Sequence, residues 1–350
     1  MAKIRIVKFG GACLTDKQNE ETLNEEGIDW CVNAVNSMLA DSPDPIIIVS
    51  GAGSFGHHLA KKYQLTLGER TLNYGEINQD RIKSRRQEIA LGMAQTKSAL
   101  LTLQQHFIKK LVSAGIPAIS VSPSSLISLY NPTEEFLDNI EDKETHEANL
   151  KEDRVLQETS FSNQIKRFVN RGLVPVLHGD VVIDIGQRSN VLSGDTIIEM
   201  LCKAYSNEDE KVPVAFFVTN VYGAYLKCPT EQDEVEAKGL IREFKLIKTE
   251  QDEQRQQNNH SLIMNMFHPQ EQEEVKNNSR MVTPEFALVD NKDVTGGFEA
   301  KLKSAMSIVK ANKDVDIFIV KCGTEDALKV LSEGTLADGV KGTHVHCKLK

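Results

Sequence analysis

The sequence lacks the cysteine spacing on which zinc ribbons and disulfide scaffolds depend. Its six cysteines are scattered over 350 residues and include no CxxC pair. A metal ribbon needs closely spaced pairs, and a disulfide scaffold serves chains too small to bury a core. This chain is long enough to bury a sizeable core, and 40% of its residues are hydrophobic. We therefore expect a globular protein of a reducing compartment.

A basic tract and a long apolar run are also missing. The formal net charge of −9 argues against a protein that binds nucleic acid by neutralising its phosphates. No apolar stretch approaches the length of a membrane span, and the opening MAKIRIVKFG is strand-like, without a charged and then apolar signal segment. We predict a cytoplasmic protein that has neither nucleic acid nor membrane as a partner.

The common signatures of nucleotide binding are absent as well. The chain contains no GxxxxGK[ST] segment and no kinase-type HRD or DFG motif. Gly51, Gly53 and Gly56 match GxGxxG, but a glycine junction already precedes them at residues 8–17, and no clear acidic strand end follows about 20 residues later. The pattern does not favour a dinucleotide site.

Short apolar, β-branched runs alternate with helical patterns over most of the chain. Continuous runs of this kind are typical of strands buried on both faces. We therefore predict an α/β fold, a three-layer αβα sandwich around a mainly parallel sheet. The expected strands are residues 4–9, 45–50, 116–121, 173–178, 181–185, 212–219 and 315–322, and the expected helices are residues 20–40, 80–114, 157–171, 195–204 and 298–311.

Two segments break this alternation. Residues 131–157 are acidic and thinly apolar, and residues 229–280 contain the polar stretches EQDEQRQQNNH and EQEEVKNNSR. Such compositions are typical of solvated insertions. We expect a mobile insertion at 229–280, with a short helix embedded around SLIMNMF, and assign no chemistry to either segment.

Four glycine-containing junctions lie at or near the ends of expected strands. They are KFGGACLTDK, SGAGSFGHH, the pair HGD and NVLSGDT, and DVTGGFEAK. In an open α/β sheet, ligands bind where loops leave the carboxyl ends of the strands. Glycines let the backbone approach a phosphate closely, and each of the four junctions also carries a lysine or histidine. Together the junctions predict a phosphate site built from several loops.

These segments, with TNVYGAY, resemble the amino acid kinase superfamily and, within it, the isopentenyl phosphate kinases. The resemblance covers nearly the whole chain apart from the two insertions, and GAGSFGH is its most specific part. It implies ATP-dependent phosphorylation of isopentenyl phosphate to isopentenyl diphosphate, with Mg²⁺, in a homodimer. It also implies a phosphate-acceptor lobe at 1–190 and an ATP lobe at 191–350, which share one sheet.

The resemblance implies catalytic roles for five side chains. Lys8 would meet the transferring phosphoryl group, and Lys17 would stabilise the transition state. His57 would bind the phosphate of the acceptor. Asp195 would orient the lysines, and Lys301 would act on the ATP side.

It also implies two binding sets made largely of backbone groups. No protein metal ligand is predicted, because Mg²⁺ would be held by the phosphates of ATP. The expected acceptor contacts are Ala52, Gly53, Gly56, His57 and Gly179, and the expected ATP contacts are Lys8, Gly10, Gly11, Gly53, Ser193, Gly194, Asp195, Thr219, Gly296, Gly297 and Lys301.

The two adjacent histidines are expected to differ in role. An acceptor phosphate is already nucleophilic near neutral pH, so a kinase of this type needs cations and hydrogen-bond donors more than a general base. Adjacent residues on a helix point in different directions, so His57 and His58 cannot both reach one phosphate. We assign the acceptor to His57 and a structural or solvent-facing role to His58. His178 stays open between a loop-capping and a ligand role.

Some departures from the family pattern leave other readings open. Ala12 stands where the family has a serine hydroxyl, and Asn220, Tyr222 and Phe298 replace its usual residues near the nucleotide. One alternative is another kinase of the superfamily, acting on a nucleoside monophosphate, a carboxylate, a carbamate or a phosphonate. A second is a non-catalytic nucleotide-binding regulator, although such a protein would not need all three of Lys8, Lys17 and Lys301.

Overall fold

The computed structural model describes most of the chain, with gaps between the described ranges. The described residues divide into two compact units. The first comprises Met1–Cys13, Asp29–Ile46 and Ile198–Lys350, and the second comprises Leu14–Ile28 and Ile47–Ile197. The described residues are 2–16, 18–72, 79–131, 140, 142–206, 211–225, 230–248, 261–266, 280–281, 297–312 and 314–349.

Some elements contain the boundaries between the units, so their two ends belong to different units. They are α1 (Gly11–Leu14), α2 (Glu25–Asp41), β2 (Ile46–Ser50) and α7 (Gly194–Ser206). The predicted lobes at 1–190 and 191–350 are defined by the ligand that each would bind, whereas the two units are defined by compactness. The lobes therefore stay a prediction.

The first unit is built on a mixed sheet with a parallel centre. β7 pairs in parallel with β1 and with β12, while β13 runs antiparallel to β12 and parallel to β9. β8, β10 and β11 add antiparallel pairs at one end. In sheet order the strands are β11 (Arg280–Met281), β10 (Ser261–Met266), β9 (Leu240–Lys248), β13 (Thr343–Leu349), β12 (Asp316–Lys321), β7 (Lys211–Thr219) and β1 (Ala2–Phe9), with β8 (Ala224–Tyr225) beside β9.

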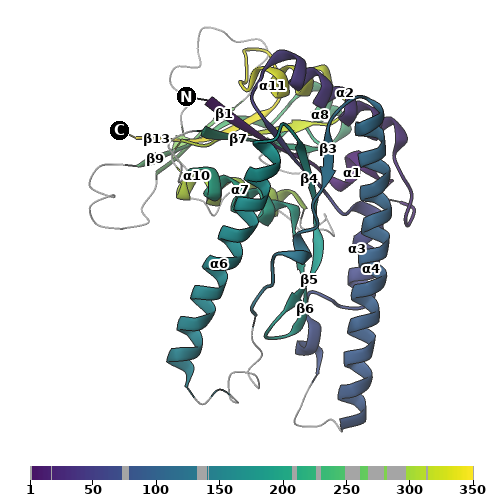
Figure 1. Ribbon diagram of the computed structural model, residues 1–350. Coiled ribbons are helices and arrows are strands. Elements are labelled where there is room, and N and C mark those ends of the chain that lie inside the picture. Colours follow the sequence, from purple (N-terminus) through teal and green to yellow (C-terminus); the bar gives the residue numbers. More distant parts are fainter. Residues whose placement is uncertain are drawn as a thin grey trace. The chain divides into compact units, whose positions relative to one another are not determined.

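Helices cover both faces of this sheet. α10 (Gly297–Ala311) packs on β12 and β13, and α11 (Glu325–Glu333) packs on β12 from the other side (Figure 1). The side chains between the layers are aromatic and branched, and Phe216 and Phe318 stack with ring centroids 5.7 Å apart. α11 begins where the Thr324 hydroxyl accepts from the Ala327 N–H at 3.2 Å. The remaining short helix is α8 (Glu231–Glu236).

The second unit contains a parallel sheet and a separate hairpin. β4 (Val174–His178) lies between β2 and β3 (Ala118–Ser120), and both pairings are parallel. β5 (Asp180–Asp184) and β6 (Arg188–Leu192) form the antiparallel hairpin. β2 and β4 are buried along their whole length, as their continuous apolar sequences predict.

Two long helices dominate the second unit. α4 (Gln79–Ser113) packs on β3 and β4, and α6 (Lys143–Val169) packs on β4. Both helices extend well beyond the ends of these strands (Figure 1). α3 (Gly53–Lys62) follows β2 and packs against α4. The 3₁₀ turns are η1 (Gly68–Thr71) and η2 (Pro123–Ser125).

The α/β class and all seven expected strands are confirmed. The start of α6 was predicted wrongly, because the sequence of its first turns is acidic, its residues 151–156 are exposed, and no apolar stripe marks the helix there. The short helix expected around SLIMNMF is also wrong, since residues 261–266 form β10, which pairs antiparallel with β9. Strand 181–185 is correct, but it pairs in the hairpin rather than in the parallel sheet. Among the described residues, no helix combines the length and the apolar character that a membrane crossing requires.

Candidate functional site

The glycine-rich segment at 50–56 runs from the last residue of β2 into the first turn of α3, within the second unit. Gly53 has φ +50°, and a Cβ there would lie 2.1 Å from the Thr15 hydroxyl oxygen, so the position requires glycine. That hydroxyl accepts a hydrogen bond of 3.0 Å from the backbone N–H of Ser54. Thr15, which the sequence analysis did not single out, therefore fixes the first turn of α3 by accepting one of its unpaired amides.

Three loops of this unit converge beside Gly179. The Gly179 N–H donates to the carbonyl of Ser50 at 3.0 Å, which ties the HGD loop to the end of β2. A Cβ on Gly179 would lie 3.5 Å from the backbone nitrogen of Gly194 and 3.9 Å from that of Ala52. Ala52 immediately precedes α3 and Gly194 opens α7. The start of two helices and a glycine turn are thus gathered in one place, which suits an anion.

Gly56 has a packing role in α3. A Cβ at this position would lie 2.8 Å from the Ala52 Cβ and 3.0 Å from a methyl group of Leu100 on α4. The absence of a side chain therefore lets α3 and α4 approach closely. This contact explains the glycine without a ligand, and its predicted place beside the acceptor stays a prediction.

The two histidines of α3 have different surroundings. His57 is exposed, whereas His58 is half-buried. His58 Nδ1 lies 2.7 Å from the Ser54 carbonyl oxygen, one helical turn earlier. Its Nε2 lies 3.6 Å from a carboxylate oxygen of Glu20 and 3.9 Å from one of Glu21. These contacts agree with the structural role expected of His58.

A buried ion pair lies directly after Gly179. Asp180 Oδ2 accepts from Lys97 Nζ at 2.6 Å, from the Ser122 hydroxyl at 3.1 Å and from the Ser124 N–H at 3.0 Å. The Asp180 side chain is fully buried and comes from β5, while Lys97 comes from the middle of α4. The pair fixes the direction in which the HGD loop leaves β4. The sequence offered no signal for it, because 83 residues separate the partners.

Burial and neighbouring charges shift the pKa of the Asp180 carboxyl in opposite directions. Burial alone would raise the pKa of the Asp180 carboxyl, but His178 and the Lys97 ammonium lower it below its usual value. Burial lowers the pKa of His178, so its ring is neutral near pH 7 and Lys97 is the lasting counter-charge. His178 Nδ1 lies 3.0 Å from the Gly179 carbonyl oxygen, which fits a loop-capping role.

Replacing Asp180 with asparagine should lower the free energy of unfolding at pH 7 by about 3–5 kcal/mol, because Lys97 would lose its buried counter-charge. A carboxyl whose pKa is lowered by folding stabilises the protein above its unfolded pKa of about 3.9 and loses that effect as pH falls through the folded value. The difference between wild type and Asp180→Asn should therefore shrink below about pH 4. Urea unfolding of both proteins at a series of pH values measures this difference in the free energy of unfolding.

The matched control for this experiment is Asp338→Asn. Asp338 also pairs with a cation, Arg242, at 3.3 Å, but its side chain is fully exposed. Exposed pairs contribute little to stability, so this variant should unfold like the wild type. A constant difference between wild type and Asp180→Asn from pH 7 to pH 3 would contradict the assignment.

The start of α7 is organised by Ser193. Its hydroxyl accepts from the Thr196 N–H at 3.1 Å and lies 2.9 Å from the Thr196 hydroxyl. This is an N-cap, which explains the serine by local structure. Asp195 follows in the first turn of the helix and is half-buried. The predicted roles of Ser193 and Asp195 toward ATP and the lysines stay predictions.

In the first unit, the predicted residues Lys8, Gly10 and Thr219 lie at the carboxyl ends of β1 and β7. The Lys8 side chain is buried, and its Nζ lies 5.9 Å from the centre of the Phe217 ring. The Gly10 N–H donates to the Val218 carbonyl at 2.8 Å, and a Cβ on Gly10 would approach that oxygen to 3.0 Å. Gly11 opens α1.

Other predicted residues are described in part or not at all. Gly297 is the first residue of α10, and Lys301 lies one turn later on the same helix. Lys17 and Gly296 lie outside the described residues, as do the expected contacts around them. The predicted site residues thus form one group in the second unit and another in the first.

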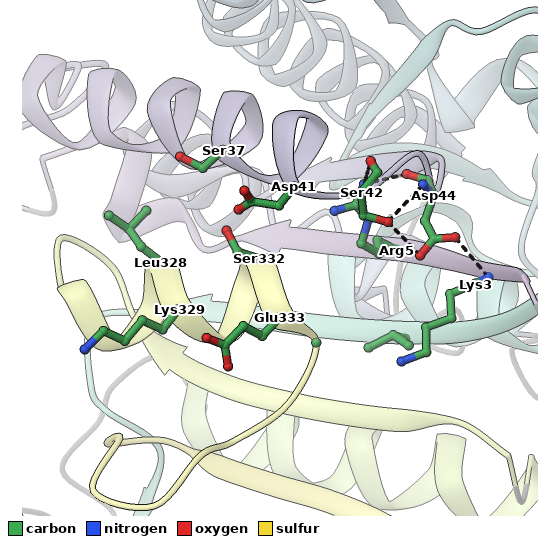
Figure 2. A pocket seen from close by; sticks show the side chains of 12 residues that line it. Lys3, Arg5, Ser37, Asp41, Ser42, Asp44, Leu328, Lys329, Ser332 and Glu333 are labelled. Atoms are coloured by element: carbon green, nitrogen blue, oxygen red, sulfur yellow. Dashed lines mark hydrogen bonds between the residues drawn. The ribbon is translucent and has the colours of Figure 1, made fainter.

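A cavity of about 850 Å³ lies elsewhere in the first unit, between β1, α2 and α11. Figure 2 shows acidic and basic side chains mixed around it. The Arg5 guanidinium in its wall donates to the carbonyl oxygens of Met38, Ser42 and Asp44 at 2.6, 3.1 and 2.5 Å. Both terminal nitrogens of this guanidinium are thus used to hold backbone carbonyls of the fold. The described lining includes none of the predicted site residues.

Comparison with known protein families shows which family the chain belongs to. Residues 3–321 match the amino acid kinase family, so the chain belongs to it. The predicted superfamily is thereby confirmed.

Several proteins that are similar to this chain carry the same name, isopentenyl phosphate kinase. The isopentenyl phosphate kinase of Methanothermobacter thermautotrophicus is 27% identical over 67% of this chain and 74% of its own. That of Arabidopsis thaliana is 25% identical over 96% of this chain and 92% of its own. The T. acidophilum isopentenyl phosphate kinase product complex superposes with a TM-score of 0.58 at 18% identity, over 98% of this chain and 100% of its own. The structural likeness confirms the predicted amino acid kinase fold.

Proposed function

We propose that this protein is an ATP-dependent kinase that converts isopentenyl phosphate into isopentenyl diphosphate. Two kinds of support meet in this assignment. The chain belongs to the amino acid kinase family, and its curated relatives from archaea and a plant are named isopentenyl phosphate kinase. The observation that carries it on the structural side is the approach of the Ala52 and Gly194 backbone nitrogens to Gly179, at the start of two helices.

The chemistry requires phosphates to be held rather than a proton to be removed. A phosphate monoester has a second pKa near 6, so the acceptor oxygen is largely a dianion at neutral pH and attacks directly. In the proposed roles, His57 donates a hydrogen bond to the acceptor phosphate. The amides before α3 and at the start of α7 bind phosphate oxygens, and the Lys8 ammonium neutralises the group in transfer.

Mg²⁺ enters this proposal with ATP. The amides and lysines of the predicted site are donors and cations, which bind phosphate and not a metal ion. That donor set fits a magnesium ion held by the nucleotide, where it would neutralise charge that develops on the phosphates. Asp195 is the carboxylate in the predicted set, and its proposed role is to orient lysines.

Three further parts of the proposal follow from the family resemblance. The acceptor would be bound by residues in 1–190 and ATP by residues in 191–350. The enzyme would be a cytoplasmic homodimer. Light scattering after size-exclusion chromatography measures the mass, and a value of one chain would contradict the dimer.

An acceptor panel tests the function. ADP release is followed with isopentenyl phosphate, dimethylallyl phosphate, UMP, acetylglutamate and fosfomycin at equal concentrations. The highest kcat/KM is expected with the isoprenoid monophosphates. A preference for UMP, acetylglutamate or fosfomycin would replace the proposed substrate with another acceptor of the family. ATP binding without turnover on any acceptor would indicate a non-catalytic regulator.

A further inference from the structure

A cluster of histidines and carboxylates lies on strands of the first unit, apart from every predicted site residue. His344 and His346 are two residues apart on β13, so their side chains lie on the same face of the sheet. Glu243 on the neighbouring strand β9 is in register with His344. The three side chains come from adjacent strands with fixed backbones, which holds them together more firmly than a loop would.

The donor atoms are close enough for one ion to bind all three. One ligand atom from each of Glu243, His344 and His346 lies within 4.8 Å of the other two. Ligands of a tetrahedral zinc ion are roughly 3.4 Å from one another, given metal–ligand distances of about 2.0–2.1 Å. The rings of His344 and His346 are stacked with 12° between their planes, so they would have to turn out of this stack for one ion to lie in both ring planes. Among the described residues, this is the one group of three His, Cys, Asp or Glu side chains that meets the distance.

The rings are oriented by contacts beneath and beside them. The His344 ring stacks on Phe318 with centroids 4.6 Å apart, and the His346 ring stacks on His344 at 4.4 Å. His344 Nε2 lies 2.8 Å from a carboxylate oxygen of Asp316. A carboxylate only accepts, so Nε2 is the donor in this contact, and Nδ1 is the ring nitrogen left to bind a metal ion. Metal-bound histidines commonly donate their other N–H to a carboxylate in this way.

The three residues can be reached from solvent. The side chains of His346 and Glu243 are 17% and 28% exposed, and that of His344 is 24% exposed. His346 Nε2 lies 2.8 Å from a carboxylate oxygen of Glu243, a pair that a divalent ion can replace by taking the place of the shared proton. Water would supply the fourth ligand.

We infer that Glu243, His344 and His346 form a binding site for one divalent transition-metal ion of the zinc class. Imidazole nitrogen with a single carboxylate oxygen suits Zn²⁺, Co²⁺ or Ni²⁺ and does not suit Mg²⁺, which prefers oxygen ligands alone. The ion would join β13 to β9. Its binding would raise the melting temperature of the protein, since it favours the folded state. The inference does not rest on the proposed kinase activity.

The test measures metal binding on the full chain, treated with a chelator and free of nucleotide, because ATP itself binds divalent ions. Equilibrium dialysis with Zn²⁺ should give one ion per chain, and Zn²⁺ but not Mg²⁺ should raise the melting temperature. His344→Asn and His346→Asn should each weaken Zn²⁺ binding at least tenfold. Asp316→Asn, which removes only the carboxylate behind His344, should weaken it by about tenfold.

His106→Asn is the matched control. His106 Nε2 also lies beside a glutamate oxygen, 3.0 Å from Glu25, so it reproduces the histidine–carboxylate pair outside the cluster. This variant should bind Zn²⁺ like the wild type. Unchanged affinity in both His344→Asn and His346→Asn would overturn the site, as would a sulfur-to-metal charge-transfer band with Co²⁺, which would show that cysteines bind the ion. Equal melting temperatures of the metal-free variants separate ligand loss from misfolding.

Discussion

Replacing Lys8 with methionine should lower kcat by roughly two to three orders of magnitude, because a preorganised charge on the transferring phosphoryl group would be lost. Lys8 is buried at the end of β1 above the Phe217 ring. Methionine keeps most of the length of the side chain and removes only the ammonium group. The KM for both substrates should change much less than kcat, since the lost interaction strengthens in the transition state.

Two measurements make this result interpretable. The melting temperature of Lys8→Met shows whether the buried position tolerates the change, and steady-state kinetics at saturating ATP gives kcat. Lys61→Met is the control, because Lys61 is an exposed lysine on α3 with no assigned role. A kcat of Lys8→Met within threefold of the wild-type value, in a folded protein, would remove Lys8 from the transfer step.

His57→Ala should lower kcat/KM for the phosphate acceptor by about 10- to 100-fold, since a hydrogen bond to a charged group is worth about 1.5–3 kcal/mol. The acceptor KM should rise and turnover should fall, while the KM for ATP should stay near its wild-type value. The KM for ATP should not change because the proposed partner of His57 is the acceptor phosphate and not the nucleotide. Initial rates over a matrix of both substrate concentrations separate these effects.

The adjacent residue supplies the control for this experiment. His58→Ala removes the contact with the Ser54 carbonyl and the neighbouring Glu20 and Glu21 carboxylates. The result should be a small loss of stability with kinetics close to wild type. If both variants lost acceptor affinity equally, or if only His58→Ala did, the assignment of the acceptor to His57 would be wrong.

The strand segments and the glycine junctions could be predicted because their causes are local. A strand buried on both faces must be apolar throughout, as β2 and β4 are, and this is legible in a short window of sequence. The junction at Gly53 needs glycine because of its own backbone conformation, with φ +50°. The family resemblance rests on the same junctions, which explains why the fold and the family were both predicted correctly.

The sequence predictions were wrong where local composition indicates one structure and strand pairing or packing produces another. Residues 261–266 are flanked by polar sequence, yet they form a strand because β9 offers an edge for pairing. The first half of α6 is acidic in sequence and its residues 151–156 are exposed, so no apolar stripe marks a helix there. Neither feature could be found from periodicity alone.

The sequence by itself determined the class of fold, the family and the loops that carry glycine and lysine. Only the tertiary structure decided which distant side chains meet: Lys97 with Asp180, the Thr15 hydroxyl with the first turn of α3, and Glu243 with His344 and His346. The physical reason is that backbone preferences act over a few residues, whereas these contacts join segments that are brought together only when helices pack and strands pair. A buried charge then persists because its partner is supplied from elsewhere in the chain.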